Sequence, residues 1–293
     1  MKHKLTHISD VFDAIERNEK EPEPGIPTGF KELDKATGGL RPGSMSVIAA
    51  RPGMGKTALV LCIINHITKT SDKSVAFYSF GGFVNQLALR LLSIESNVDP
   101  RKLHLCKVSN DERKRVSEAC HDLRNRAIYL HNHTIKFKKA FHTLKDLDNL
   151  GLVIFDDIDC LFYTGKKKQK ARLCALISQI IKEMAKGLNV PIIVTSQISR
   201  KLEKRHDKRP TLDDFRKSSC NNLEPDADVI IFLYRDYYYN EGGDPNTAEC
   251  IIAKNRYGEV LTVPLFWNDE CGFFTDTYTQ ANRNEEDNDG NDF

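Results

Sequence analysis

The stretch Ala50-Arg51-Pro52-Gly53-Met54-Gly55-Lys56-Thr57 decides the fold of this chain. It fits the template of a phosphate-binding loop, except that Ala50 stands where the first Gly is usual. Small residues let backbone N–H groups approach a phosphate, and the start of a helix adds a favourable dipole. The template predicts that Lys56 reaches the β- and γ-phosphates of a nucleotide and that Thr57 places its hydroxyl on Mg²⁺. The predicted nucleotide-binding residues are Arg51, Pro52, Gly53, Met54, Gly55, Lys56 and Thr57.

Strands and helices alternate on both sides of this loop. Ser44–Ala49 predicts a strand before it, and the residues from Gly55 to about Ile67 predict a helix after it. The alternation predicts an α/β fold with a mostly parallel sheet covered by helices on both faces, and close-set late strands predict an antiparallel edge. The other expected strands are Ser74–Ser79, Leu152–Phe155, Pro191–Thr195, Asp228–Tyr234, Ala248–Lys254 and Val260–Trp267, and the other expected helices are Phe83–Leu92 and Ala171–Gly187, the latter with Leu173, Leu176, Ile177, Ile180, Ile181 and Met184 as core residues.

An acidic position for a metal follows the strand Leu152–Phe155. Asp156 comes directly after these four apolar residues. In nucleotide-hydrolysing proteins with a phosphate-binding loop, an acid at the end of another core strand holds Mg²⁺. We therefore expect Thr57 and Asp156 to hold the metal, with Asp156 acting through water.

The composition excludes several classes of protein. The 293 residues, 40% hydrophobic and 29% charged, fit one large α/β domain or two small ones. A net charge of +2 excludes a protein that coats nucleic acid by bulk positive charge. No apolar stretch approaches a membrane span and no signal-peptide core follows Met1–Lys4, so a cytoplasmic protein without a membrane partner is expected. The eight scattered cysteines form no Cys-x-x-Cys pair and are expected to be free thiols.

The two ends of the chain differ from its middle. Residues Leu5–Lys20 show the apolar spacing of an amphipathic helix, and Glu21–Gly25 breaks it with two prolines. Such a short helix is expected to pack on a neighbouring subunit. The tail from Ala281 contains five acids and one Arg and is expected to be disordered. It contributes −4 to the net charge of +2, which leaves +6 on the rest of the chain.

Ordered blocks along the chain resemble the RecA-like C-terminal motor domain of DnaB-type replicative DNA helicases. They extend from about Leu5 to Phe274, and Ala50 in place of Gly is typical of that family. The resemblance implies a linker helix and hinge at 1–24, a RecA-like ATPase domain at 25–280 and the tail at 281–293, with no room for the family's N-terminal domain. The blocks are Gly25–Asp34, Thr37–Gly43, Ala49–Leu59, Gln86–Leu92, Ser196–Arg200, Asp207–Pro210, Asp226–Asp236 and Ile252–Gly258.

The resemblance implies a hexameric ring at the replication fork or nucleoid that uses ATP and Mg²⁺ to move along single-stranded DNA, with a helicase loader or primase as partner. In such rings the nucleotide lies between subunits, and Gln197 would sense its γ-phosphate. Lys254 and Arg256 match the family's Lys-x-Arg pair and would reach the neighbour's nucleotide, where a guanidinium stabilises the transferring phosphoryl group. The implied catalytic residues are Lys56, Asp156, Gln197, Lys254 and Arg256.

The segment Ile198–Cys220 corresponds to the family's DNA-facing loops. Residues 200–217 include eight basic residues and four acids. Cations that line a ring channel contact phosphates without reading the base sequence. The expected DNA contacts are Arg200, Arg216, Lys217 and Ser219. The run Lys166–Lys168, with Lys170 beyond it, is expected to be a solvated loop.

Two motifs depart from the family's pattern. Gly81 occupies the position of a Glu that polarises the attacking water, which Gly cannot do. Asp157 is the nearest substitute, because some related motors place the base directly after the magnesium acid. The alternation of side chains along a strand is the argument against it. The run Arg216–Ser219 reads Arg-Lys-Ser-Ser where Arg-Glu-Ser-Gly is typical.

Two functions follow from these departures, and a third follows from a further resemblance. The first is a working ATPase and helicase in which Asp157 or another carboxylate replaces the lost base. The second is a subunit that binds nucleotide but hydrolyses it poorly, as a loader, decoy or structural partner of an active ring. The third is a RecA- or RadA-like recombination ATPase, because Lys254–Gly258 resembles a RadA motif. The Gly25–Gly43 segment favours the helicase type over this third function.

Overall fold

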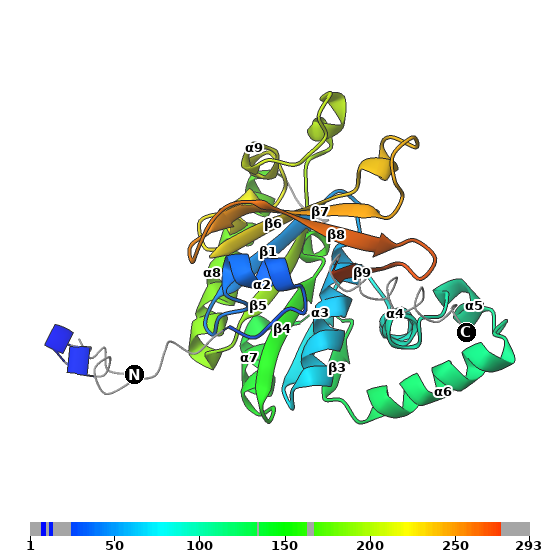
Figure 1. The fold of residues 1–293 in the computed structure, drawn as a ribbon. Helices are drawn as coiled ribbons and strands as arrows, with labels where there is room; N and C mark the ends of the chain where they lie inside the picture. Colours follow the sequence, from blue (N-terminus) through cyan, green and yellow to red (C-terminus); the bar gives the residue numbers. More distant parts are fainter. Residues whose placement is uncertain (1–6, 10–11, 14–24, 134, 163–166, 277–293) are drawn as a thin grey trace.

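The computed structural model describes residues 7–9, 12–13, 25–133, 135–162 and 167–276 (Figure 1). The expected helix Leu5–Lys20 lies outside the described residues except for a few positions, and the acidic tail from Ala281 lies wholly outside them. The division of the chain at residues 24 and 280 therefore stays a prediction.

Within the described residues one sheet of nine strands organises the fold, in the order β3-β2-β4-β5-β1-β6-β7-β8-β9. Neighbouring strands from β3 to β6 are parallel, and those from β6 to β9 are antiparallel. The expected α/β fold with an antiparallel edge is confirmed. The strands are β1 (Met45–Ala50), β2 (Ser74–Ser79), β3 (Ile128–His131), β4 (Leu150–Asp156), β5 (Ile192–Gln197), β6 (Val229–Tyr234), β7 (Thr247–Asn255), β8 (Thr262–Asn268) and β9 (Phe273–Asp276).

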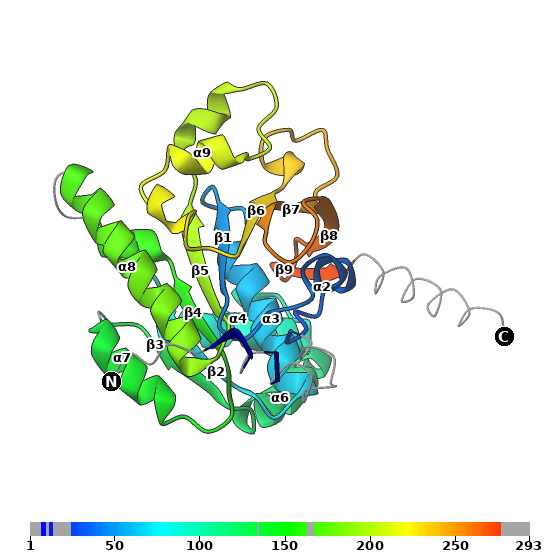
Figure 2. The ribbon, with the colours of Figure 1, turned by 90° about the vertical axis from the view of Figure 1, so that its left-hand side faces the viewer.

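Helices cover both faces of this sheet, as Figure 2 shows. The helices α3 and α4 pack on one face and α7 and α8 on the other, so that an apolar core lies on each side of the sheet. The α-helices are α2 (Lys31–Thr37), α3 (Lys56–Thr70), α4 (Val84–Ser96), α5 (Pro100–His104), α6 (Asn110–Arg124), α7 (Phe137–Lys145), α8 (Lys167–Leu188) and α9 (Leu212–Arg216). Short 3₁₀ helices are η1 (Ile158–Phe162), η2 (Arg200–Lys204), η3 (Asn221–Leu223) and η4 (Asp236–Tyr238).

The central strands have continuous apolar sequences because both of their faces are covered. All six residues of β1, β2 and β6 are buried. At the antiparallel edge the pattern changes to alternation, and in β8 Val263, Leu265 and Trp267 are buried between more exposed neighbours. The sequence pattern therefore distinguishes the covered parallel strands from the half-covered edge.

The helix α8 differs from its prediction in two ways. It begins at Lys167, so the described part of the lysine-rich run is helical and is not a loop. Leu173 and Leu176 were predicted core residues, yet their exposed fractions are 43% and 54%. The first turns of α8 project away from the sheet (Figure 2), which leaves this part of the apolar stripe without a layer to cover it.

Some other elements of the described chain were not predicted, because their sequences lack a clear apolar pattern. The helix α6 is strongly polar, and its clearest mark is the capping box that Ser109 and Glu112 form at its start. The strand β3 has only four residues, none of them fully buried. No helix in the described part of the chain has the length and apolar content of a membrane span. The cysteines of the described chain form no disulfide bond.

Candidate nucleotide site

The phosphate-binding loop lies between the end of β1 and the start of α3, as its sequence predicts. Gly53 and Gly55 have φ angles of 83° and 98°, a backbone conformation that favours glycine. A Cβ atom on Gly55 would also lie 2.7 Å from the ring of Phe274. The guanidinium of Arg51 turns inward, where its Nε donates to Glu203 at 2.8 Å and its Nη1 to the carbonyl of Ile198 at 2.9 Å. The loop is thus fixed to the segment that follows β5.

The predicted metal ligands lie next to each other. The hydroxyl of Thr57 donates to Oδ2 of Asp156 at 3.0 Å, and the hydroxyl of Thr195 donates to Oδ1 of the same carboxylate. Burial raises the pKa of Asp156, and the two hydroxyl donors oppose this effect. A hydroxyl and a carboxylate oxygen at this separation suit a hard cation that prefers oxygen ligands. The residues present therefore fit Mg²⁺.

Gln197 and Asp157 lie beside the loop. Parallel pairing of β1 and β5 places Gln197 opposite Ala50. Its side-chain Nε2 donates to Oδ2 of Asp157 at 2.9 Å, and the same oxygen lies 4.0 Å from Nζ of Lys56. The alternation of faces that argued against Asp157 does not apply, because β4 ends at Asp156. Both neighbouring carboxylates therefore reach the site.

Gly81 lies two residues beyond β2 and close to η1. A Cβ atom at this position would lie 3.0 Å from Sγ of Cys160, which is tighter than most such contacts. Any side chain here would require Cys160 to move.

Lys254 and Arg256 lie near the amino-terminal ends of the parallel strands, whereas the loop lies at their carboxyl-terminal ends. Asn255 pairs with Val229 at the start of β6, whereas the loop follows the end of β1, which runs parallel to β6. Lys254 Nζ donates to the carbonyl of Glu224 at 2.6 Å, and Arg256 pairs with Asp228 at 3.2 Å. Burial and the charge of Arg256 lower the pKa of Lys254. The fold therefore separates this pair from the phosphate-binding loop of the same chain.

Three of the four expected DNA contacts line one cavity of about 280 Å³: Arg200, Lys217 and Ser219. Arg216 instead lines a neighbouring cavity of about 390 Å³, and it pairs with Glu224 at 2.7 Å and with Asp213 at 3.1 Å. Lys170 lines both cavities from the first turn of α8, so the sequence prediction missed this residue by assigning it to a loop. The hydroxyl of Ser218 is buried there without a partner among the described residues.

The sequence profile of the DnaB-like helicase C-terminal domain matches residues 25–276 of this chain. The chain belongs to the DnaB-like helicase C-terminal domain family. It is 36% identical over 280 residues to the replicative DNA helicase DnaC of Bacillus subtilis (strain 168), covering 92% of this chain and 61% of the relative. It is 31% identical over 275 residues to a probable plasmid replicative DNA helicase of Chlamydia psittaci, covering 92% and 60%. This DnaB-like domain thus spans about three fifths of the length of the curated relatives it matches.

Solved structures have the same fold. One of them, described as an ATPase domain, superposes with a TM-score of 0.80 at 32% identity, covering 92% of this chain and 96% of that one. A DnaB-like replicative helicase, described together with its interactions with primase, gives the same TM-score and identity and covers 92% of this chain and 67% of that one. The RecA-like fold expected from the resemblance is therefore confirmed.

A cavity of about 380 Å³ in this DnaB-like domain opens beside the phosphate-binding loop. Lys56 and Thr57 line it together with Arg90 of α4 and Trp267 of β8. The guanidinium of Arg235 lies 4.1 Å from the centroid of the Trp267 ring and supports it from the interior. No motif marks Trp267 in the sequence, and Arg90 is visible only as part of the Gln86–Leu92 block.

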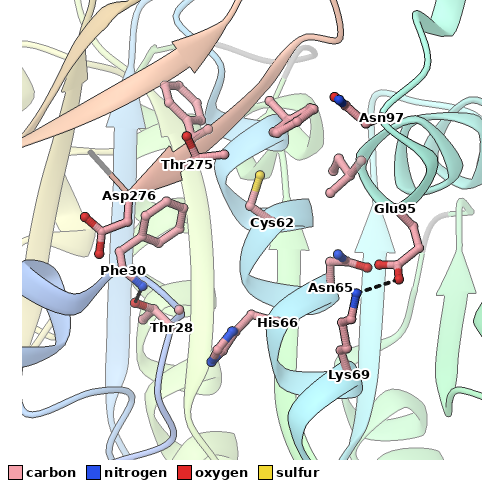
Figure 3. Close-up of a pocket in the computed structure, with 14 residues that line it drawn as sticks. Thr28, Phe30, Cys62, Asn65, His66, Lys69, Glu95, Asn97, Thr275 and Asp276 are labelled. Carbon is pink, nitrogen blue, oxygen red and sulfur yellow. Dashed lines mark hydrogen bonds and ion pairs between the residues drawn. The ribbon is translucent and has the colours of Figure 1, made fainter. Parts of the chain in front are cut away.

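A further cavity of about 340 Å³ lies between α3, α4 and β9, as Figure 3 shows. None of the predicted site residues lines it. One side is closed by the ion pair between Lys69 and Glu95, whose atoms lie 2.8 Å apart, and Phe30 and Asp276 lie on the other side. This cavity therefore belongs to the packing of α3 on α4 and β9.

Proposed function

We propose that this DnaB-like domain is the ATP-hydrolysing motor of a replicative DNA helicase that acts on single-stranded DNA as a hexameric ring. One observation carries the proposal. The residues for binding nucleotide and metal meet at the carboxyl-terminal ends of the parallel strands, while Lys254 and Arg256 lie near the amino-terminal ends. A site with both sets requires the cations of a second subunit, as a ring supplies them.

The chain's own residues would bind and orient the nucleotide. Lys56, at the start of α3, would contact the β- and γ-phosphates together with the backbone N–H groups of the loop. Thr57 and Asp156 would hold Mg²⁺, which neutralises charge on the phosphate oxygens when it is bound. Gln197 would contact the γ-phosphate from the end of β5.

Asp157 would accept the proton of the attacking water. The water oxygen forms its bond to the γ-phosphorus as this proton leaves, and the bond between that phosphorus and the β–γ bridging oxygen breaks to give ADP and phosphate. The distances from Asp157 to Gln197 Nε2, 2.9 Å, and to Lys56 Nζ, 4.0 Å, support this role. Lys254 and Arg256 of the adjacent subunit would stabilise the charge on the transferred group.

The cavity lined by Arg200, Lys217 and Ser219 would receive the DNA backbone. The cationic side chains of this cavity suit the phosphates of DNA, and Gln197 also lines the cavity. A primase is proposed as protein partner because one structural relative was described with its interactions with primase. A helicase loader is proposed from the family resemblance alone.

ATP turnover with and without single-stranded DNA tests the proposal, with Lys56→Ala as the inactive control. We expect turnover well above the Lys56→Ala background and an increase on adding DNA. A hydrolysis-deficient accessory subunit is the second candidate, favoured by the absence of a carboxylate at Gly81. Wild-type turnover equal to that of Lys56→Ala, with nucleotide binding retained, would support this second function and contradict the first.

A further inference from the structure

Asp159 is a partly buried carboxylate that the proposed hydrolysis chemistry does not use. Its Oδ2 accepts hydrogen bonds from the hydroxyl of Ser196 and from the backbone N–H of Gln197, both at 2.7 Å. Its Oδ1 accepts one from Sγ of Cys220 at 3.4 Å. A single side chain of η1 therefore joins the end of β5 to the residue that precedes η3.

One end of this connection is the proposed γ-phosphate sensor. Gln197 is held at two points, its side chain by Asp157 at 2.9 Å and its backbone by Asp159 at 2.7 Å. The backbone N–H of Asp159 also donates to Oδ1 of Asp157 at 3.2 Å. A displacement of Gln197 toward a phosphate therefore changes the surroundings of both carboxylates.

The other end is the segment expected to contact DNA. Cys220 is fully buried and directly follows Ser219. Asp159, Gln197 and Lys217 line the same cavity. Burial and the charge of Asp157 raise the pKa of Asp159 to about 6, so at neutral pH its carboxylate is ionised and accepts hydrogen bonds from both sides. These bonds connect Gln197 to Cys220, the residue that follows Ser219.

We propose that Asp159 is a positioning residue that couples the contact between Gln197 and the nucleotide to the placement of the segment Lys217–Ser219. The inference rests on the proposed function, since it assigns Gln197 to the γ-phosphate and this segment to DNA. Coupling is reciprocal: DNA that orders the segment also orients Gln197 through Cys220 and Asp159. DNA would then raise the rate of hydrolysis through this connection.

The first test compares Asp159→Ala with Asp159→Asn in the full chain. The alanine variant is expected to lose about five-fold or more of the stimulation of ATP turnover by single-stranded oligothymidylate. Its affinity for a fluorescent ATP analogue, measured without DNA, should change less than about two-fold. The asparagine variant should retain stimulation, because its amide can accept from Gln197 and Ser196 through oxygen and donate to Cys220 through nitrogen.

The second test changes only the far end of the connection. Cys220→Ala removes the donor and should lose stimulation, whereas Cys220→Ser keeps a donor and should retain it. Cys250→Ala is the matched control, because Cys250 is an equally buried thiol in β7, outside the connection. This second pair decides the matter if Asp159→Ala does not fold.

The outcomes separate the inference from the function on which it rests. Wild-type turnover that DNA does not stimulate would contradict the proposed function. Wild-type stimulation that persists unchanged in folded Asp159→Ala, or in Cys220→Ala, would overturn the inference alone. Loss of stimulation in both alanine variants, with retention in Asp159→Asn and Cys220→Ser, would support it.

Discussion

Two adjacent carboxylates at the candidate nucleotide site differ because their partners differ. Both oxygens of Asp156 accept hydrogen bonds from the hydroxyls of Thr57 and Thr195, and the side chain is buried. Asp157 accepts from the amide of Gln197 and lies near the ammonium group of Lys56, facing the nucleotide site. Asp156 is therefore suited to hold a metal in a fixed position, and Asp157 to accept a proton.

The role of Asp157 can be tested by removing its basicity while keeping its shape. Asp157→Asn should lower the rate of ATP turnover by about 100-fold or more, because an amide cannot accept the water proton. Binding of a fluorescent ATP analogue should be preserved, because the loop and Lys56 are unchanged. Turnover close to wild type in this variant would contradict the assignment of the base.

A second experiment tests whether a carboxylate at position 81 can replace Asp157 as the base. Gly81→Glu combined with Cys160→Ala should restore part of the turnover of Asp157→Asn. The second substitution is needed because a Cβ at position 81 would lie 3.0 Å from Sγ of Cys160. Gly81→Asn with Cys160→Ala is the matched control and should restore nothing. Equal turnover of the Glu and Asn variants would show that position 81 does not face the water.

At the scale of elements, one carboxylate fastens α3 to α4. Glu95 of α4 pairs with Lys69 of α3 at 2.8 Å and with Arg126, just before β3, at 2.9 Å. Burial alone would raise its pKa, yet hydrogen bonds from Arg126 and Lys69 lower it from 4.5 to about 2. Glu95 is 5% exposed and Arg126 is 8% exposed, whereas Lys69 is 59% exposed and largely screened by water.

Glu95→Gln should therefore lower the free energy of unfolding by about 2 kcal/mol, while Lys69→Met should cost less than about 1 kcal/mol. Because the folded pKa is depressed, the stabilisation is present above pH 4.5 and is lost as the pH falls toward 2. Urea unfolding at pH 7 and at pH 3 measures both effects. A difference between wild type and Glu95→Gln that does not shrink at pH 3 would contradict the attribution to charge.

The sequence predicted those elements whose pattern arises from burial on the sheet. The strands β1, β2 and β6 are apolar throughout because they are covered on both faces, and they were predicted within about a residue. The helix α6 was not predicted, because it is polar and most of its surface faces water. The apolar periodicity of α8 wrongly predicted that Leu173 and Leu176 are buried, because periodicity does not show where a helix extends beyond the sheet.

The candidate site divides in the same manner. The placement of the loop between β1 and α3 could be predicted because the loop motif has fixed spacing. The placement of Asp156 at the end of β4 could be predicted because it directly follows four apolar residues. The position of Asp157 could not, because it depends on the residue at which β4 ends. Lys170 and Trp267 reach their cavities only through tertiary packing, which leaves no local pattern.

At the scale of the whole molecule, the separation of Lys254 and Arg256 from the loop predicts complementation between subunits. Lys56→Ala and Arg256→Ala proteins should each be inactive as ATPases, for different reasons. Mixed at equal amounts and reassembled, they should recover about a quarter of wild-type turnover, because one interface in four joins an intact loop to an intact Arg256. Arg256→Ala turnover equal to wild type, or a mixture as inactive as its components, would contradict the shared site.

The same separation has a consequence for the protein before it assembles. On the proposed mechanism, a lone subunit has what it needs to pick up ATP but lacks the cations that make the bond break quickly. Free subunits would bind ATP, and the bound ATP would remain unhydrolysed until a neighbouring subunit binds. Assembly of the ring would then start hydrolysis, and ATP would be consumed only by complete rings.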